Sequence, residues 1–373
     1  MKNLFRYVSV FLLLFFTLFS TRGYALSLEK KYPNYSYVFH EFDVDESYLY
    51  DDDFIAFVSE NEKRLRHFYE RSLKRGKMLL PMMQGLLLKD GMSDLFIYLS
   101  MVESGFLTDA VSAKKAVGLW QFMPATAKHY NLEVCNNYDE RYDAMSATSA
   151  AITYLNKLHK QFGKWYLAAM AYNCGEGCMK KALRDARTDD LSILIDDNLK
   201  YLPKETRLYM KKILLVALIG EKNILDFGSY GSDLIQVEVS GGTSLLYLAK
   251  LLSMKDETLL ALNRQYKGLY LPKIKKVYKI SIPVNKIYAF YLRYEMPKNT
   301  VDIKSKIMPP KYLYQLSYHV ELGDSLESIA HKYDSKVEAI KRANHLKYSF
   351  LTLDALLLIP VSKDIFQRYN KQK

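Results

Sequence analysis

Cysteine is scarce in this chain, and no sequence pattern typical of a metal site is present. Among 373 residues there are three cysteines without a Cys-x-x-Cys pair, and seven histidines without a His-x-x-x-His pair. These absences argue against a zinc hydrolase and a zinc-stabilised domain. Glycine and proline are also few, at 16 and 10, which argues against a collagen-like or disordered chain. We expect a globular protein of two or three domains with no metal and no cofactor.

Long apolar runs are also missing, apart from a short stretch near the start. Residues 8–19 are mostly apolar, fewer than the roughly 20 that a membrane-spanning helix needs. Lys2 and Arg6 precede the run, and the small residues Gly23 and Ala25 follow it. This order is typical of a secretory signal, so we predict export to the periplasm or cell envelope. If the signal stayed uncleaved, it would associate the protein with the membrane.

Acidic residues are outnumbered by basic ones, 41 to 53, and the formal net charge is +12. Such a charge favours an anionic partner, which could be nucleic acid, a membrane surface or a polyanionic cell wall. The export signal and the lack of a recognition motif argue against nucleic acid. The 31 tyrosines and 18 phenylalanines suit sugar rings as ligands, and they suit core packing equally well.

Two patterns of apolar residues divide the rest of the chain. Helical spacing without strand-like alternation continues to about residue 225 and predicts an all-α region. Beyond it, two copies of a strand, helix, helix, strand pattern each end in an apolar strand and a proline. The predicted organisation is a signal peptide (1–25), an N-terminal polar segment with helices (26–84, irregular to about 53), a helical domain (85–225), a first repeat (234–285), a linker (286–314), a second repeat (315–362) and a basic tail (363–373).

One predicted helix carries a candidate acid. Nearly every residue from Leu95 to Val102 is apolar, Glu103 follows, and Gly105 is where a helix would stop. A carboxylate at the carboxyl end of a buried helix faces desolvation and the negative end of the helix dipole, so its pKa should rise. A carboxylic acid that is still protonated near neutral pH is what protonation of a glycosidic oxygen requires.

Three further segments combine glycines with aromatic and amide side chains. They are Gly-Leu-Trp-Gln-Phe-Met-Pro-Ala-Thr-Ala at 118–127, Ala-Tyr-Asn-Cys-Gly at 171–175, and Tyr-Leu-Pro-Lys-Glu-Thr-Arg-Leu-Tyr at 201–209. Each also has a purely structural interpretation: Trp120 as core, Asn173 as a helix stop and Glu205 as a first-turn charge. For Glu205 we favour the structural interpretation.

Together and in this order, the four segments resemble the catalytic domain of soluble-type, lysozyme-like lytic murein transglycosylases. Within them the membrane-bound lytic murein transglycosylase D group, in which this domain precedes LysM repeats, is the most similar. Residues 315–362 look like a LysM module and 234–285 like a degenerate one. The resemblance therefore implies an α+β multidomain fold: an all-α lysozyme-like catalytic domain followed by two small βααβ LysM-type modules.

The resemblance also implies roles for individual residues. Glu103 matches the family's single catalytic acid/base, which closes a 1,6-anhydro ring on N-acetylmuramic acid without consuming water, so that peptidoglycan glycan strands are the implied partner. The implied substrate-binding residues are Ser104, Gly118, Trp120, Gln121, Tyr172, Asn173 and Tyr209, and we expect Gln121, Asn173 and Tyr209 to converge on Glu103. The implied glycan-binding LysM residues are Gly323, Asp324, Ser325, Leu326 and Asn344.

Several alternatives stay open at this point. A hydrolytic lysozyme-type muramidase would share the fold and the acid but would need a second acid, for which Asp94 and Asp109 are nearest in sequence. A LysM protein that binds glycan without cleaving it is a second alternative. The family more often has Met at the Trp120 position, which would alter the cleft shape. In an oxidising compartment two cysteines could pair, either Cys135 with one of Cys174 and Cys178 or these two with each other, the last in a strained short loop.

Overall fold

The chain divides into two units, residues 1–296 and 297–373, each of which has its own core. The structure is a computed structural model, and it describes residues 28–227, 234–294, 314–321, 323–344, 346, 351 and 355–370. The predicted signal peptide lies outside these residues. Within the described residues no helix is long and apolar enough to cross a membrane.

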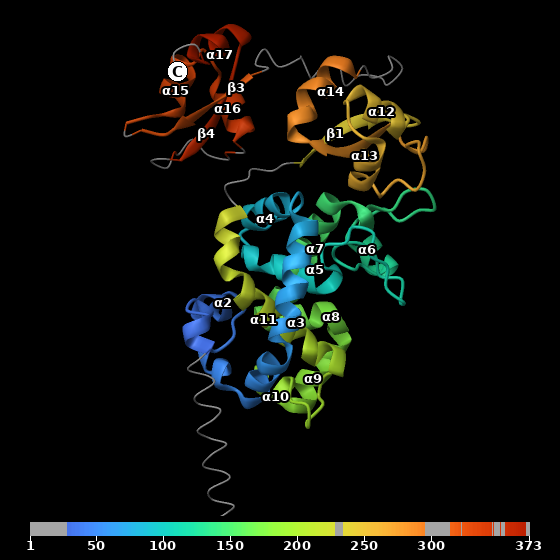
Figure 1. The fold of residues 1–373 in the computed structure, drawn as a ribbon, viewed down its shortest axis with the longest axis vertical. Helices are drawn as coiled ribbons and strands as arrows, with labels where there is room; N and C mark the ends of the chain where they lie inside the picture. Colours follow the sequence, from blue (N-terminus) through green and yellow to red (C-terminus); the bar gives the residue numbers. More distant parts are fainter. Residues whose placement is uncertain are drawn as a thin grey trace, which may run out of the picture. The chain divides into compact units, whose positions relative to one another are not determined.

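Residues 28–227 form the helical body that opens the first unit (Figure 1). Its described residues contain isolated β-bridges but no strand, as the helical spacing predicts. The α-helices are α2 (Tyr35–Glu41), α3 (Asp52–Gly76), α4 (Leu80–Lys89), α5 (Ile97–Ser104), α6 (Pro124–His129), α7 (Ala144–Phe162), α8 (Trp165–Cys174), α9 (Glu176–Ala186), α10 (Leu191–Leu194) and α11 (Lys204–Phe227). Short 3-10 helices are η1 (Glu46–Tyr50), η2 (Asp94–Phe96) and η3 (Glu140–Tyr142).

Helix α5 runs through the core of this body. Its residues from Ile97 to Met101 are all buried, so the expectation of burial on more than one face is confirmed. Helix α11 packs against α3, α5 and α8 and places Tyr209 in the same core. The helix ends at Gly105, whose φ of 59° lies in the left-handed region where glycine is favoured.

The prediction that residues 26–53 are irregular is wrong. Helices α2 and η1 lie there, and Phe39, Phe42 and Leu49 are fully buried in the same core as α5. The Asp45 carboxylate accepts the Ser47 amide and caps η1. The apolar residues of these short helices are spaced among many polar ones, so the sequence pattern is weak although the burial is complete. The core therefore begins well before residue 85.

Both repeats fold as strand, helix, helix, strand. In the first, β1 (Leu234–Ser240) pairs antiparallel with β2 (Val277–Pro283), and α12 (Leu245–Leu251) and α13 (Asp256–Leu262) lie between them in sequence. In the second, β3 (Tyr314–His319) pairs antiparallel with β4 (Leu356–Val361), and α15 (Leu326–Lys332) and α16 (Val337–Ala343) lie between.

Equivalent asparagines lock the two repeats in the same way. Asn263 donates from Nδ2 to the Ser281 carbonyl and accepts the Ser281 amide, at 2.9 and 2.7 Å. Asn344 does the same with both backbone groups of Leu358, at 2.7 Å each. Each side chain thereby takes the place of a strand partner for its second β-strand. The sequence repeat is thus also a structural repeat.

Two segments that we expected to be unstructured are helices. The predicted linker, 286–314, begins too early, because α14 (Ile287–Arg293) packs Phe290 into the core of the first repeat. The predicted basic tail, 363–373, contains α17 (Lys363–Asn370), which packs Phe366 and Tyr369 against the core of the second repeat. The two helices have only seven and eight residues, so the apolar spacing of each is short in the sequence. Residues 295–313, which include the rest of the predicted linker, lie outside the described residues.

The first repeat is joined to the helical body by a buried polar cluster. The Asp143 carboxylate caps α7 by accepting the Ser146 amide, and it also accepts from the side-chain amides of Gln236 and Gln265. Beside it, the Tyr138 and Tyr266 rings stack at 5.1 Å between centroids. A repeat held in this way is a fixed part of the first unit.

Candidate active site

Glu103 lies in the last turn of α5, where its neighbours fix the loop that follows the helix. Ser104 donates from Oγ to the carbonyls of Ser100 and Leu119, at 3.1 and 2.9 Å. Ser100 donates to the same Leu119 carbonyl at 2.9 Å. Ser104 therefore ties the loop of residues 118–121 to α5.

Burial raises the pKa of Glu103 to about 7, as the sequence predicts. The Tyr209 hydroxyl lowers this pKa by hydrogen bonding, and the negative charge of Glu205 raises it. A carboxyl group with this pKa is half protonated near neutral pH. It can therefore act both as an acid and, after giving up its proton, as a base.

Two tyrosines lie beside this carboxyl group. Burial first, and then the charge of Glu103, raise the pKa values of Tyr172 and Tyr209 well above the ordinary value. The Tyr172 hydroxyl donates to the Trp120 carbonyl at 2.7 Å. The Tyr209 hydroxyl is buried without a partner at full hydrogen-bond geometry, yet it is close enough to lower the pKa of Glu103. Both phenols therefore remain neutral donors next to the acid.

The loop of residues 118–121 owes its shape to one glycine. Gly118 has a φ of 78°, and a Cβ there would lie 2.0 Å from the Arg141 carbonyl oxygen. No other residue fits so close an approach. The Trp120 side chain is fully buried and donates from Nε1 to Thr148 Oγ1 at 2.9 Å. Trp120 is therefore part of the core, and its side chain has no exposed surface.

Gln121 and Asn173 make their hydrogen bonds within the walls of the site. Gln121 donates from Nε2 to the carbonyls of Gly118 and Ala110, at 2.8 and 3.3 Å. Asn173 accepts at Oδ1 from the Thr206 hydroxyl at 2.8 Å and so joins the end of α8 to the start of α11. Of the three side chains expected to converge on Glu103, the structure brings Tyr209 into direct interaction with it.

The cysteines beside Asn173 are paired with each other. Cys174 and Cys178 form a disulfide between the end of α8 and the first turn of α9, and their Cα atoms are 5.8 Å apart. Cys135 is free and exposed. Gly175 has a φ of 90° and lies between the paired cysteines, which permits the tight turn between the two helices. The structure therefore excludes a disulfide between Cys135 and either of the other two cysteines. The bond forms instead within the short loop between α8 and α9.

Glu205 influences the candidate acid, although sequence analysis assigned it a structural role. It occupies the first turn of α11, exposed, where a structural role was expected. Its charge nevertheless raises the pKa of Glu103. The sequence could have indicated this interaction, because Glu205 lies four residues before Tyr209 and residues at this spacing share one face of a helix.

The candidate LysM residues support the second repeat from within. Asp324 accepts from the Tyr318 hydroxyl and the Glu321 amide, at 2.7 and 2.8 Å, and Ser325 caps α15. Leu326 is fully buried, and Asn344 binds Leu358. Gly323 has a φ of 94° at the preceding turn. These contacts build the fold of the repeat, and Gly323 and Ser325 also lie exposed on its surface.

Comparison with known proteins supports this organisation. Residues 87–195 match the Transglycosylase SLT domain, and residues 318–360 match the LysM domain. The chain carries an SLT transglycosylase domain and a LysM domain. The described residues contain no group of three or more His, Cys, Asp or Glu side chains placed to hold a metal ion.

This chain matches known transglycosylases over part of their length. It is 30% identical over 269 residues to membrane-bound lytic murein transglycosylase D of Escherichia coli K12, a match that covers 68% of this chain and 57% of that protein. The chain thus spans a little over half the length of this relative.

Two solved structures are also similar. Lytic transglycosylase Slt of Pseudomonas aeruginosa, in an inactive mutant, shares 23% identity at a TM-score of 0.31, over 41% of this chain and 24% of that one. The 70 kDa soluble lytic transglycosylase of Escherichia coli shares 21% identity at a TM-score of 0.33. That match covers 38% of this chain and 24% of the other.

Proposed function

We propose that this protein is a peptidoglycan lytic transglycosylase of the cell envelope and that Glu103 is its single acid/base. The observation that carries the proposal is the raised pKa of Glu103, about 7, at the end of a buried helix within the SLT domain. The SLT and LysM matches and the similarity to a membrane-bound murein transglycosylase support the substrate and the location.

The proposed reaction uses the same proton-carrying group twice. Protonated Glu103 donates to the oxygen between N-acetylmuramic acid and N-acetylglucosamine, and the bond from that oxygen to C1 breaks. The resulting carboxylate then takes the proton of the muramoyl C6 hydroxyl, whose oxygen bonds to C1 and closes the 1,6-anhydro ring. Atoms and charges balance without water, and Glu103 ends protonated again. The neutral phenol of Tyr209 can donate a hydrogen bond to the carboxylate, while the Tyr172 hydroxyl already donates to the Trp120 carbonyl.

Neither acid considered for a hydrolytic alternative is among the groups that shift the pKa of Glu103. Asp94 is buried and accepts from Gln84 Nε2 at 2.7 Å. Asp109 forms an ion pair with Arg264 at 3.2 Å. Glu205 is the carboxylate that acts electrostatically on Glu103, so a hydrolase built on this site would use Glu205 to position water.

Mass spectrometry of the muropeptides released from purified murein tests the proposal. We expect 1,6-anhydro ends from the wild-type protein and a loss of product of at least about a hundredfold with Glu103→Gln, as for removal of a general acid. Free reducing ends that disappear with Glu205→Gln would instead establish the hydrolase. Unchanged cleavage by the Glu103→Gln variant would refute the assignment of the acid.

A further inference from the structure

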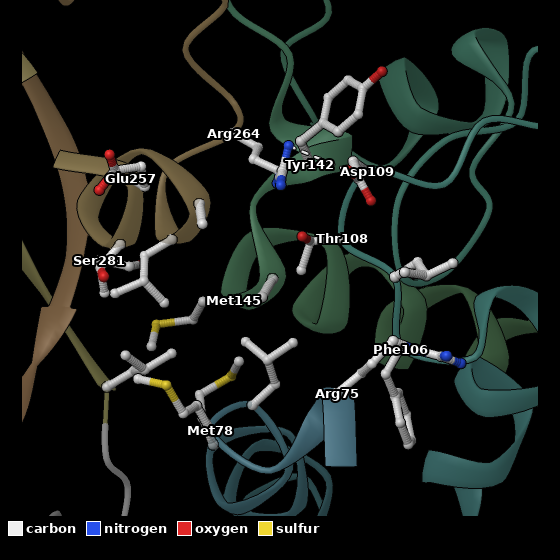
Figure 2. A pocket seen from close by; sticks show the side chains of 18 residues that line it. Arg75, Met78, Phe106, Thr108, Asp109, Tyr142, Met145, Glu257, Arg264 and Ser281 are labelled. Atoms are coloured by element: carbon white, nitrogen blue, oxygen red, sulfur yellow. Dashed lines mark ion pairs between the residues drawn. The ribbon is translucent and has the colours of Figure 1, made fainter. Parts of the chain in front are cut away.

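A cavity of about 530 Å³ lies in the first unit between the helical body and the first repeat (Figure 2). Its lining combines the end of α3, the start of α4, the loop after α5, the start of α7 and α13. Much of that lining is apolar and includes the sulfur-bearing side chains of Met78, Met82 and Met145. The volume is within the range of small-ligand sites, which are mostly apolar with a few polar groups.

The loop that follows the candidate acid lines one side of the cavity. Phe106, which lines it, is three residues beyond Glu103, and three residues span at most about 11 Å. The same loop is held at both ends. Arg75 donates from Nε to the Gly105 carbonyl at 2.8 Å, and Gln121 donates to the Ala110 carbonyl. A ligand held at Glu103 can therefore reach the cavity with a short branch.

Four charged side chains line this cavity, and two of them are paired with each other. Arg264 of the first repeat binds Asp109 of the helical body. Arg75 donates only to neutral oxygens, those of Gly105 and Ser72, and Glu257 forms no ion pair in the described part of the chain. In Figure 2 Arg75 and Glu257 lie on different sides of the cavity, from α3 and α13. Arg75 and Glu257 are both exposed, so one positive and one negative charge are available at the rim of the cavity.

We propose that this cavity binds the peptide stem of the glycan strand held at Glu103, an inference that rests on the proposed function. Peptide stems branch from the muramoyl residue and carry aliphatic side chains, free carboxylates and, where uncrosslinked, a free amine. Arg75 receives a stem carboxylate and Glu257 the amine, while the methionines contact the aliphatic parts. The first repeat thereby contributes a wall of the substrate site.

The test compares two substrates, intact murein strands and strands stripped of their stems by an amidase. We expect Arg75→Gln and Glu257→Gln each to lower kcat/KM on intact strands about tenfold, the effect of one lost charged hydrogen bond. On stripped strands Glu257→Gln should match the wild-type protein within about twofold. Arg75→Gln also loses the hydrogen bond to the Gly105 carbonyl, so it should lose less on stripped strands than on intact ones. Blocking the stem carboxylates should remove the effect of Arg75→Gln, and acetylating the amine should remove that of Glu257→Gln.

Matched controls separate recognition from folding. Arg71→Gln removes an exposed arginine one turn earlier on α3, and Asp256→Asn removes the neighbouring first-turn acid of α13; neither residue lines the cavity. Both controls should cleave intact strands at the wild-type rate, and thermal melts should show all four variants folded.

Equal losses on both substrates, or no loss on intact strands, would overturn the peptide-stem site while leaving the proposed function in place. A wild-type protein that releases no anhydro ends from either substrate would overturn the proposed function itself, together with the inference that rests on it.

Discussion

The carboxyl group of Glu103 is less stable as an ion in the folded protein than in the unfolded chain. Its pKa rises from 4.5 to about 7 through burial. At a pH below the pKa of the unfolded chain, Glu103 is protonated in both the folded and the unfolded state, so it does not change the free energy of unfolding. As pH rises through the folded pKa, the unfolded state has already ionised, so folding loses up to about 3 kcal/mol, at about 1.4 kcal/mol for each pH unit of the difference.

The substitution Glu103→Gln should therefore stabilise the protein above neutral pH. We expect the free energy of unfolding to rise by about 2 to 3 kcal/mol near pH 8 and to change little near pH 4, because glutamine cannot ionise. Urea unfolding at the two pH values measures the difference. An equal change at both would show that Glu103 ionises freely in the folded state.

Two neighbours of Glu103 should shift the pH dependence of cleavage in opposite directions. Because the Tyr209 hydroxyl lowers the pKa of Glu103, Tyr209→Phe should move the alkaline limit of activity upward. Because the charge of Glu205 raises that pKa, Glu205→Gln should move the limit downward, and less so at high salt, since Glu205 is exposed. Rate profiles for anhydro-product release measure both shifts, and shifts of the same sign would contradict the electrostatics.

At the scale of elements, the loop between α5 and α6 depends on a glycine that touches a neighbouring backbone. Gly118→Ala should destabilise the fold by about 3 kcal/mol, since the new Cβ meets the Arg141 carbonyl and the backbone is left-handed. Gly163→Ala is the matched control, because Gly163 has a φ of 80° and open space around it. It should cost only about 1 kcal/mol, the penalty of the conformation alone. Equal costs in chemical denaturation would contradict the close contact.

The sequence predicted the elements that have strong periodicity or sharp ends. Helix α5, its stop at Gly105 and the two strand–helix–helix–strand repeats follow from apolar spacing and glycine placement. It could not predict what depends on tertiary contact. Trp120 resembles a cleft residue in its motif but is enclosed by α7, and Glu205 resembles an ordinary first-turn acid until the fold brings it near Glu103.

At the scale of the whole molecule, the two repeats are alike in sequence but differ in how they are used. The first has Gln236 and Gln265, whose amides reach the buried Asp143, and it shares a tyrosine stack with the helical body. No sequence pattern marks those contacts, since they join residues about a hundred positions apart. The second repeat has its own core and belongs to a separate unit.

This difference predicts opposite results for two truncations. A chain that ends at residue 294 keeps both cores of the first unit, so it should melt as the full protein does and cleave soluble glycan at an unchanged rate. It should lose retention on insoluble murein, because the LysM domain is gone and the local concentration of enzyme at the murein falls.

A chain that ends at residue 227 instead uncovers Tyr138 and the Asp143 carboxylate, so it should melt at lower temperature and lose activity. Thermal melts, soluble turnover and murein pull-down measure the three properties. If the shorter chain were as stable and active as the longer one, the first repeat would have no part in the catalytic unit.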